Sequence, residues 1–160
     1  MVTGANGYLA SYIVQDLLAS GHTVHACVRN ADNAESVQHL RARMTKEGVG
    51  NRLKLFSTGN LQSVGDTHAF DLPMKDCDAV IHAATPVNVK FGDHSGERDI
   101  FQPAMTSTRE LLECIERTNN TVRCLVLTSS MAAMAPRPEP SIKDESHWSD
   151  ASSQKARDNW

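Results

Sequence analysis

The sequence has 160 residues, enough for one domain with a substantial hydrophobic core. Hydrophobic residues make up 40%, charged residues 22%, and the net charge is −3, values that indicate neither a nucleic-acid nor a membrane partner. The apolar runs fall short of the roughly 18 residues that span a bilayer, and the N-terminus lacks a signal-peptide pattern, so a cytoplasmic protein is expected.

Helices and strands are expected to alternate through the first part of the chain. Met1 and Val2 lead into the segment TGANGYLA, residues 3–10. Apolar residues recur at helical spacing after this segment, and later stretches alternate and contain β-branched residues. The elements predicted here are a helix over residues 9–18, a strand over 22–29, a polar helix over 34–47 and a strand near 52–57.

The alternation continues through the rest of the chain. A weak helical pattern covers about residues 63–70, and two apolar runs, over 77–84 and 122–130, are typical of buried parallel strands. The segment 135–160 is rich in Pro, Ser and Asp and is expected to be a loop. A longer helix is predicted over 99–117 with five apolar residues facing inward, namely Ile100, Met105, Leu111, Leu112 and Ile115.

This order of elements predicts an α/β protein with a Rossmann-type, doubly wound parallel sheet and helices on both faces. The first strand is nearly absent, since only Met1 and Val2 precede Thr3, while a typical strand has about five or six residues. So short a strand is expected to leave the centre of the sheet open and to weaken the fold. We therefore expect an incomplete fold, with a dinucleotide-binding core at residues 1–134 and a loop at 135–160.

The glycines of TGANGYLA carry the first functional signal. Gly4 would permit a tight turn, Gly7 would let the backbone approach a pyrophosphate, and Ala10 is small enough for close packing of the next helix on the sheet. The N-terminus of that helix would offer its free N–H groups to the phosphates. The alternative is a turn that simply needs glycine, and the strand–helix context favours the dinucleotide site.

The end of the second predicted strand distinguishes between the nicotinamide cofactors. An NAD site requires a carboxylate there to hold the ribose 2′-hydroxyl. This chain has Arg29 and Asn30, with no acid before Asp32. Because arginine can hold a 2′-phosphate that a carboxylate would repel, the pattern favours NADP(H). The alternative is that Arg29 is a solvated loop cation.

Other reactive side chains are interpreted as structural. The four cysteines have no paired spacing, and the seven histidines form no pair with metal-ligand spacing beside a carboxylate, so no metal site is expected. His82 lies within an apolar run and is expected to be a packed, hydrogen-bonded core histidine.

Several segments, taken in order, resemble the extended short-chain dehydrogenases: TGANGYLA, TVHACVR, CDAVIHAATPV, LVLTSS and DESHWSD. The resemblance extends over essentially the whole chain. It points to the branch that contains dihydroflavonol 4-reductase and cinnamoyl-CoA reductase, within the NAD-dependent epimerase/dehydratase family. It implies an NADP(H)-dependent reduction of an aldehyde or ketone that uses a serine, a tyrosine and a lysine.

The resemblance also implies which residues act in the site. Ser130, the second serine of LTSS, matches the catalytic serine and would donate to the carbonyl oxygen as negative charge develops there. Without the resemblance, Ser130 would be interpreted as a strand end whose hydroxyl caps local backbone. The cofactor-binding residues implied are Thr3, Gly4, Gly7, Tyr8, Leu9, Ala10, Arg29, Asn60, Leu61, Ala83, Ala84 and Thr85.

The chain also departs from the family pattern. A Tyr-x-x-x-Lys is expected shortly after DESHWSD, but no tyrosine stands four residues before Lys155, and the sequence ends at Trp160. Asn60 stands where the family usually has Asp, and Glu110 where its helix often carries Asn. We therefore expect an N-terminal fragment that lacks the catalytic helix and the substrate-binding part and is inactive by itself.

Three functions remain open from the sequence. The first is an NADP(H)-dependent carbonyl reductase, and the second is a nucleotide-sugar epimerase or dehydratase, or a steroid dehydrogenase, of the same superfamily. The third is a non-catalytic dinucleotide-binding module, should the chain be truly this short. The partner expected is a small-molecule carbonyl or alcohol, with no nucleic acid and no membrane, and the sequence indicates no oligomeric state.

Overall fold

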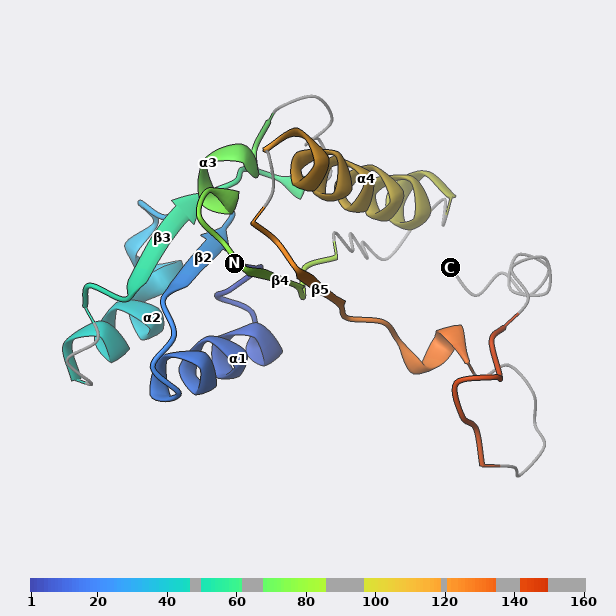
Figure 1. The fold of residues 1–160 in the computed structure, drawn as a ribbon, viewed down its shortest axis with the longest axis horizontal. Helices are drawn as coiled ribbons and strands as arrows, with labels where there is room; N and C mark the ends of the chain where they lie inside the picture. Colours follow the sequence, from blue (N-terminus) through green and yellow to red (C-terminus); the bar gives the residue numbers. More distant parts are fainter. Residues whose placement is uncertain (47–49, 62–67, 86–96, 119–120, 135–141, 150–160) are drawn as a thin grey trace.

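A five-stranded parallel sheet, in the strand order β3-β2-β1-β4-β5, forms the centre of the computed structural model (Figure 1). The structure describes residues 1–46, 50–61, 68–85, 97–118, 121–134 and 142–149. The strands are β1 (Val2–Thr3), β2 (Val24–Val28), β3 (Leu53–Ser57), β4 (Ala79–His82) and β5 (Cys124–Leu127). The helices are α1 (Tyr8–Ala19), α2 (Ala34–Lys46), α3 (Asp71–Met74) and α4 (Gln102–Arg117), with a π turn at Glu97–Phe101 and a 3₁₀ turn at Met131–Ala133.

The elements confirm the predicted alternation and the Rossmann-type fold class. Helices α1 and α2 cover one face of the sheet, and α3 and α4 cover the other (Figure 1). The predicted helix over 63–70 lies largely outside the described residues, and the short helix α3 begins only at Asp71.

Strand β1 has two residues, yet it closes the centre of the sheet. Val2 pairs with Ala26 of β2 and Ile81 of β4, and both residues of β1 are fully buried. Just before the strand, the Met1 amine donates to the Ala79 carbonyl at 2.7 Å, and the Ile81 N–H donates to the Met1 carbonyl at 2.9 Å. The expectation that so short a strand leaves the centre open is therefore wrong, because β2 and β4 both pair with it.

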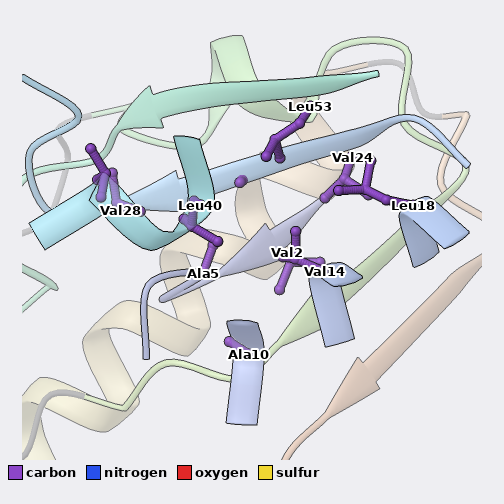
Figure 2. Close-up of a cluster of buried hydrophobic side chains, with 11 residues drawn as sticks. Val2, Ala5, Ala10, Val14, Leu18, Val24, Val28, Leu40 and Leu53 are labelled. Carbon is purple, nitrogen blue, oxygen red and sulfur yellow. The ribbon is translucent and has the colours of Figure 1, made fainter. Parts of the chain in front are cut away.

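The first face of the core is formed by α1 and α2. In α1 the buried residues Ala10, Val14 and Leu18 recur every fourth position and form one stripe against the sheet. Figure 2 shows Val14 beside Val2 of β1 and Leu18 beside Val24 of β2. Each fully buried Val or Leu stabilises the fold by about 1.5–3 kcal/mol.

The second face is formed by α3 and α4, and it differs in part from the prediction. Leu111 is fully buried and Ile115 packs against the same cluster, as expected. The prediction was wrong for Met105 and Leu112, which are 44% and 45% exposed. The inward stripe of α4 follows a different set at helical spacing, and two of its members are polar: Pro103, Ser107, Glu110, Leu111 and Cys114.

Strand β5 also differs from its predicted environment. The apolar run over 122–130 was expected to be buried, but all four residues of β5 are exposed, with Val126 and Leu127 at 49% and 53%. The reason is its position, because β5 is at the edge of the sheet and pairs with β4 alone among the described strands.

Candidate functional site

A cleft of about 410 Å³ opens where the strands β1, β2, β3 and β4 end. The carboxyl ends of parallel strands meet at one edge of such a sheet, and ligands bind outside that edge. The turn after β1, the loop after β2 and the first turn of α2 contribute to the cleft, as do the loops after β3 and β4. Its described lining is Gly4, Asn6, Cys27, Val28, Arg29, Asn30, Asn33, Ser36, Thr58, Gly59, Asn60, Leu61, Ala84 and Thr85.

The turn after β1 requires glycine at Gly4. Its φ is +60°, in the left-handed region, and a Cβ built there would lie 2.9 Å from the Cβ of Ala84. The turn closes when the Gly7 N–H donates to the Gly4 carbonyl at 2.8 Å, and α1 begins as the Ser11 N–H donates to the Gly7 carbonyl. The backbone of this turn therefore faces the loop after β4 at close range.

Thr3 joins this turn to the loop after β4. Its Oγ1 accepts the N–H groups of Ala83 and Ala84, at 3.1 and 3.2 Å, and lies 2.9 Å from Nδ1 of His82. His82 is buried, which confirms that it is a packed, hydrogen-bonded core histidine, and burial lowers its pKa to about 4. The imidazole is therefore neutral near pH 7.

The loop after β2 presents Arg29 to the cleft. The Gly59 N–H donates to the Arg29 carbonyl at 3.1 Å, while the exposed guanidinium makes no hydrogen bond with the described residues. The loop is held by the Ser57 hydroxyl, which accepts the Ala31 N–H at 2.9 Å. Among the described lining residues none carries a carboxylate, and Asp32 does not reach the cleft.

The structure gathers part of the predicted site in the cleft, namely Gly4, Arg29, Asn60, Leu61, Ala84 and Thr85. Another part lies behind the cleft wall and shapes it, namely Thr3, Gly7, Ala10 and Ala83. Tyr8 and Leu9 project from the start of α1, at 86% and 51% exposure, and do not line the cleft.

Ser130 lies apart from the cleft. It is exposed and follows β5, so it shares the carboxyl edge of the sheet but is two strands away from β1. Its carbonyl accepts the Ala133 N–H at 2.9 Å, at the 3₁₀ turn that begins with Met131. The described structure places no tyrosine beside it, because Tyr8 and Tyr12 pack against each other on α1.

Sequence reasoning missed the polar residues at the start of α2. The Asn33 side chain accepts the Ser36 N–H at 3.2 Å, and Asn6 of the glycine turn donates to the Ser36 carbonyl at 3.3 Å. The Asn33-x-x-Ser36 spacing is a helix-start signal that would have located the turn. Nothing in the sequence indicates that the turn lies across from Asn6.

Among the residues that the structure describes, the remaining reactive groups do not form a second centre. Cys27, Cys77 and Cys114 are buried, and burial raises the pKa of Cys27 and of Cys114 to about 12. Within the described ranges, no three His, Cys, Asp or Glu side chains lie together so that they could hold a metal ion. None of the described helices is both long and apolar enough to cross a membrane.

Comparison with known proteins identifies relatives of this arrangement. Residues 1–154 match the NAD dependent epimerase/dehydratase family. Tetraketide alpha-pyrone reductase 2 of Arabidopsis thaliana is 35% identical over 153 residues, which cover 94% of this chain and 45% of that protein. Cinnamoyl-CoA reductase CAD2 of Medicago truncatula is 37% identical over 154 residues, covering 94% and 44%. The chain thus spans less than half the length of these relatives.

A solved structure shares the fold. Yeast methylglyoxal/isovaleraldehyde reductase Gre2, crystallised as a complex with NADPH, superposes with a TM-score of 0.75 at 27% identity. The match covers 94% of this chain and 43% of Gre2. The described sheet therefore corresponds to part of the larger fold of Gre2.

Proposed function

The chain belongs to the NAD dependent epimerase/dehydratase family, and from that membership we propose that it forms the NADP(H)-binding part of a reductase. The complete reaction is the reduction of an aldehyde or ketone to an alcohol. The observation that carries the choice of cofactor is Arg29 at a cleft whose described lining contains no carboxylate. Residues 1–134 form the cofactor-binding unit of this proposal.

The cleft suits a dinucleotide with a 2′-phosphate. A guanidinium can hold phosphate oxygens through two parallel hydrogen bonds, and the Arg29 guanidinium makes no hydrogen bond with the described residues. The NADPH complex of the Gre2 relative supports the same cofactor. The 2′-phosphate is assigned to Arg29 and to the first turn of α2, where Asn33 and Ser36 line the cleft.

The glycine turn suits the diphosphate. At Gly4 a side chain would fill the space that faces Ala84, so the backbone can approach a ligand closely. The first N–H groups of α1 follow this turn and are available to phosphate oxygens. Loop residues Ala84 and Thr85 complete the wall of the same cleft.

The reaction requires a donor beside the substrate carbonyl. A bound NADPH would supply a hydride to the carbonyl carbon, and the negative charge that develops on the oxygen would need a hydrogen-bond donor. In this proposal the hydroxyl of Ser130, at the carboxyl edge of the sheet after β5, donates a hydrogen bond to that oxygen. Protonation of the oxygen needs an acid such as the tyrosine of the family pattern. The 160-residue chain has no Tyr-x-x-x-Lys, so we expect it to bind cofactor without reducing a carbonyl.

The test measures the affinity of the 160-residue chain for NADPH and for NADH, by fluorescence titration or calorimetry. NADPH should bind more tightly, and Arg29→Ala should weaken NADPH about tenfold or more while leaving NADH nearly unchanged. Arg123→Ala is the matched control, because it removes the same charge from an exposed position just before β5. Equal affinity for both cofactors in the unmodified chain would contradict the proposal.

A further inference from the structure

A single hydroxyl joins the end of β1 to the end of β4 and to the loop that follows β4. Thr3 is fully buried at the end of β1, beside His82 at the end of β4, although the two are 79 residues apart in sequence. Its oxygen lies within hydrogen-bond distance of three groups: the N–H of Ala83, the N–H of Ala84 and the Nδ1 of His82. The next residues of this loop, Ala84 and Thr85, line the cleft.

These contacts determine where each proton lies. A threonine hydroxyl has one proton and two acceptor lone pairs. The N–H groups of Ala83 and Ala84 can only donate, so together they occupy both lone pairs. The hydroxyl proton must then point at Nδ1 of His82, and this nitrogen must carry a lone pair. The imidazole is therefore in the neutral form with its proton on Nε2.

We propose that His82 is a positioning residue for the cofactor cleft, and that its Nδ1 lone pair orients the Thr3 hydroxyl so that Thr3 holds the backbone of the loop after β4. The proposal rests on the proposed function, since its consequence is the affinity for NADP(H). With the loop held in this way, Ala84 stays against Gly4, where the contact distance leaves no room for a side chain. Without it, at least one loop N–H loses its buried acceptor.

The surroundings of His82 keep it neutral. His82 shares the α4 side of the sheet with Val80, two residues before it on β4. The titratable groups on that side include the thiols of Cys27 on β2 and Cys114 on α4, which burial keeps protonated. They also include Cys77 and the His25 imidazole, which contact each other, and the carboxylates of Glu110 and Asp71, which are both paired with Arg117. Burial alone accounts for the lowered pKa of His82. No described charge is therefore placed to favour the imidazolium.

The first test is the protonation state of His82 in the unliganded 160-residue chain. Nitrogen-15 NMR of the histidine side chains should show His82 with a bare Nδ1 and a protonated Nε2 at pH 7. Under the same conditions the Ala83 and Ala84 amides should exchange slowly with solvent. A proton on Nδ1 would overturn the proposal, because the Thr3 hydroxyl could then not donate to it.

The second test compares two variants of His82. His82→Asn keeps an acceptor at the δ position and should retain slow amide exchange and NADP⁺ affinity. His82→Leu removes the acceptor and should speed exchange of the loop amides and weaken NADP⁺ binding about tenfold, the effect of one lost buried hydrogen bond. A core residue with only a packing role would give the reverse order, because Leu preserves apolar packing better than Asn. That reverse order would overturn the proposal.

A second pair of variants, at Thr3, tests the same hydrogen bonds in case the His82 variants do not fold. Thr3→Ser retains the hydroxyl and should behave like the parent, while Thr3→Val retains the shape and loses the three hydrogen bonds. Faster exchange of the Ala83 and Ala84 amides in Thr3→Val alone would support the role of the hydroxyl, and unchanged exchange would overturn it. Should the parent bind no NADP⁺, the proposed function fails, and the tautomer and the exchange rates still decide the positioning role.

Discussion

Strands β1 and β5 lie in the same parallel sheet, separated only by β4, and both are short. The residues of β1 are fully buried, with a neighbour strand on each side and helices above and below, whereas every residue of β5 is exposed. The wholly apolar strand β5 is the exposed one and the half-polar strand β1 is the buried one, so neighbours in the sheet and not hydrophobicity decide their burial. The cleft of the candidate site is built around β1, and Ser130 follows β5.

The largest expected effect tests the difference in burial between β1 and β5 by placing the same charge in both strands. Val2→Asp puts a carboxylate into the centre of the core and should destabilise the chain by about 4 kcal/mol or more, which amounts to loss of folding. Val126→Asp changes a half-exposed residue of β5 and should alter stability by less than about 1 kcal/mol. Urea unfolding followed by circular dichroism measures both. A comparable loss in the two variants would show that β5 is buried in solution.

A smaller effect separates two glycines with left-handed backbone. Gly4→Ala should cost about 3 kcal/mol, because the φ of +60° disfavours a side chain and the new Cβ would meet Ala84. Gly21→Ala is the matched control, since its φ is +88° but no atom lies within 4 Å of the added Cβ. It should cost about 1–2 kcal/mol from the backbone alone. Thermal unfolding should rank the two variants in that order, and equal losses would mean that the loop after β4 moves away without cost.

The third effect is the dependence of stability on pH. The pKa of His82 in the folded chain is about 4, below the ordinary value of 6.5. The folded state therefore resists protonation, and stability is complete above pH 6.5 and falls as the pH drops from 6.5 toward 4. At pH 5 the loss from this group is about 2 kcal/mol. His82→Asn should unfold in urea with a smaller difference between pH 7 and pH 5 than the parent. An unchanged difference would assign the acid sensitivity to other groups.

Prediction of the fold from the sequence succeeded where local pattern decides structure. The helical spacing of apolar residues over 9–18 predicted the helix α1, and the alternating segment before Arg29 is the strand β2. The face of α1 that packs on the sheet was not predicted, because the spacing was followed through Leu9 and Tyr12, which are 51% and 52% exposed. Prediction failed for Met105 and Leu112, because several faces of α4 carry apolar residues and only the sheet selects the face that packs. It also failed for β5, whose burial depends on what covers an edge strand.

The candidate site shows the same division. Gly4 and Arg29 could be assigned from motifs, because a tight turn and a basic residue after a strand are visible in a few adjacent positions. Asn33 and Ser36 were missed, since their part in the cleft depends on the distance between α2 and the glycine turn.

The order of strands and helices, the glycine turn and the basic residue after β2 can be predicted from the sequence alone, because they depend on periodicity and on conformations that few residues adopt. Three other features depend on the tertiary structure. Two residues of β1 suffice to close the sheet, Thr3 and His82 meet although they are 79 positions apart, and β5 is exposed. Burial and hydrogen-bond partnership are properties of neighbours in space, and most of those neighbours are distant in the chain.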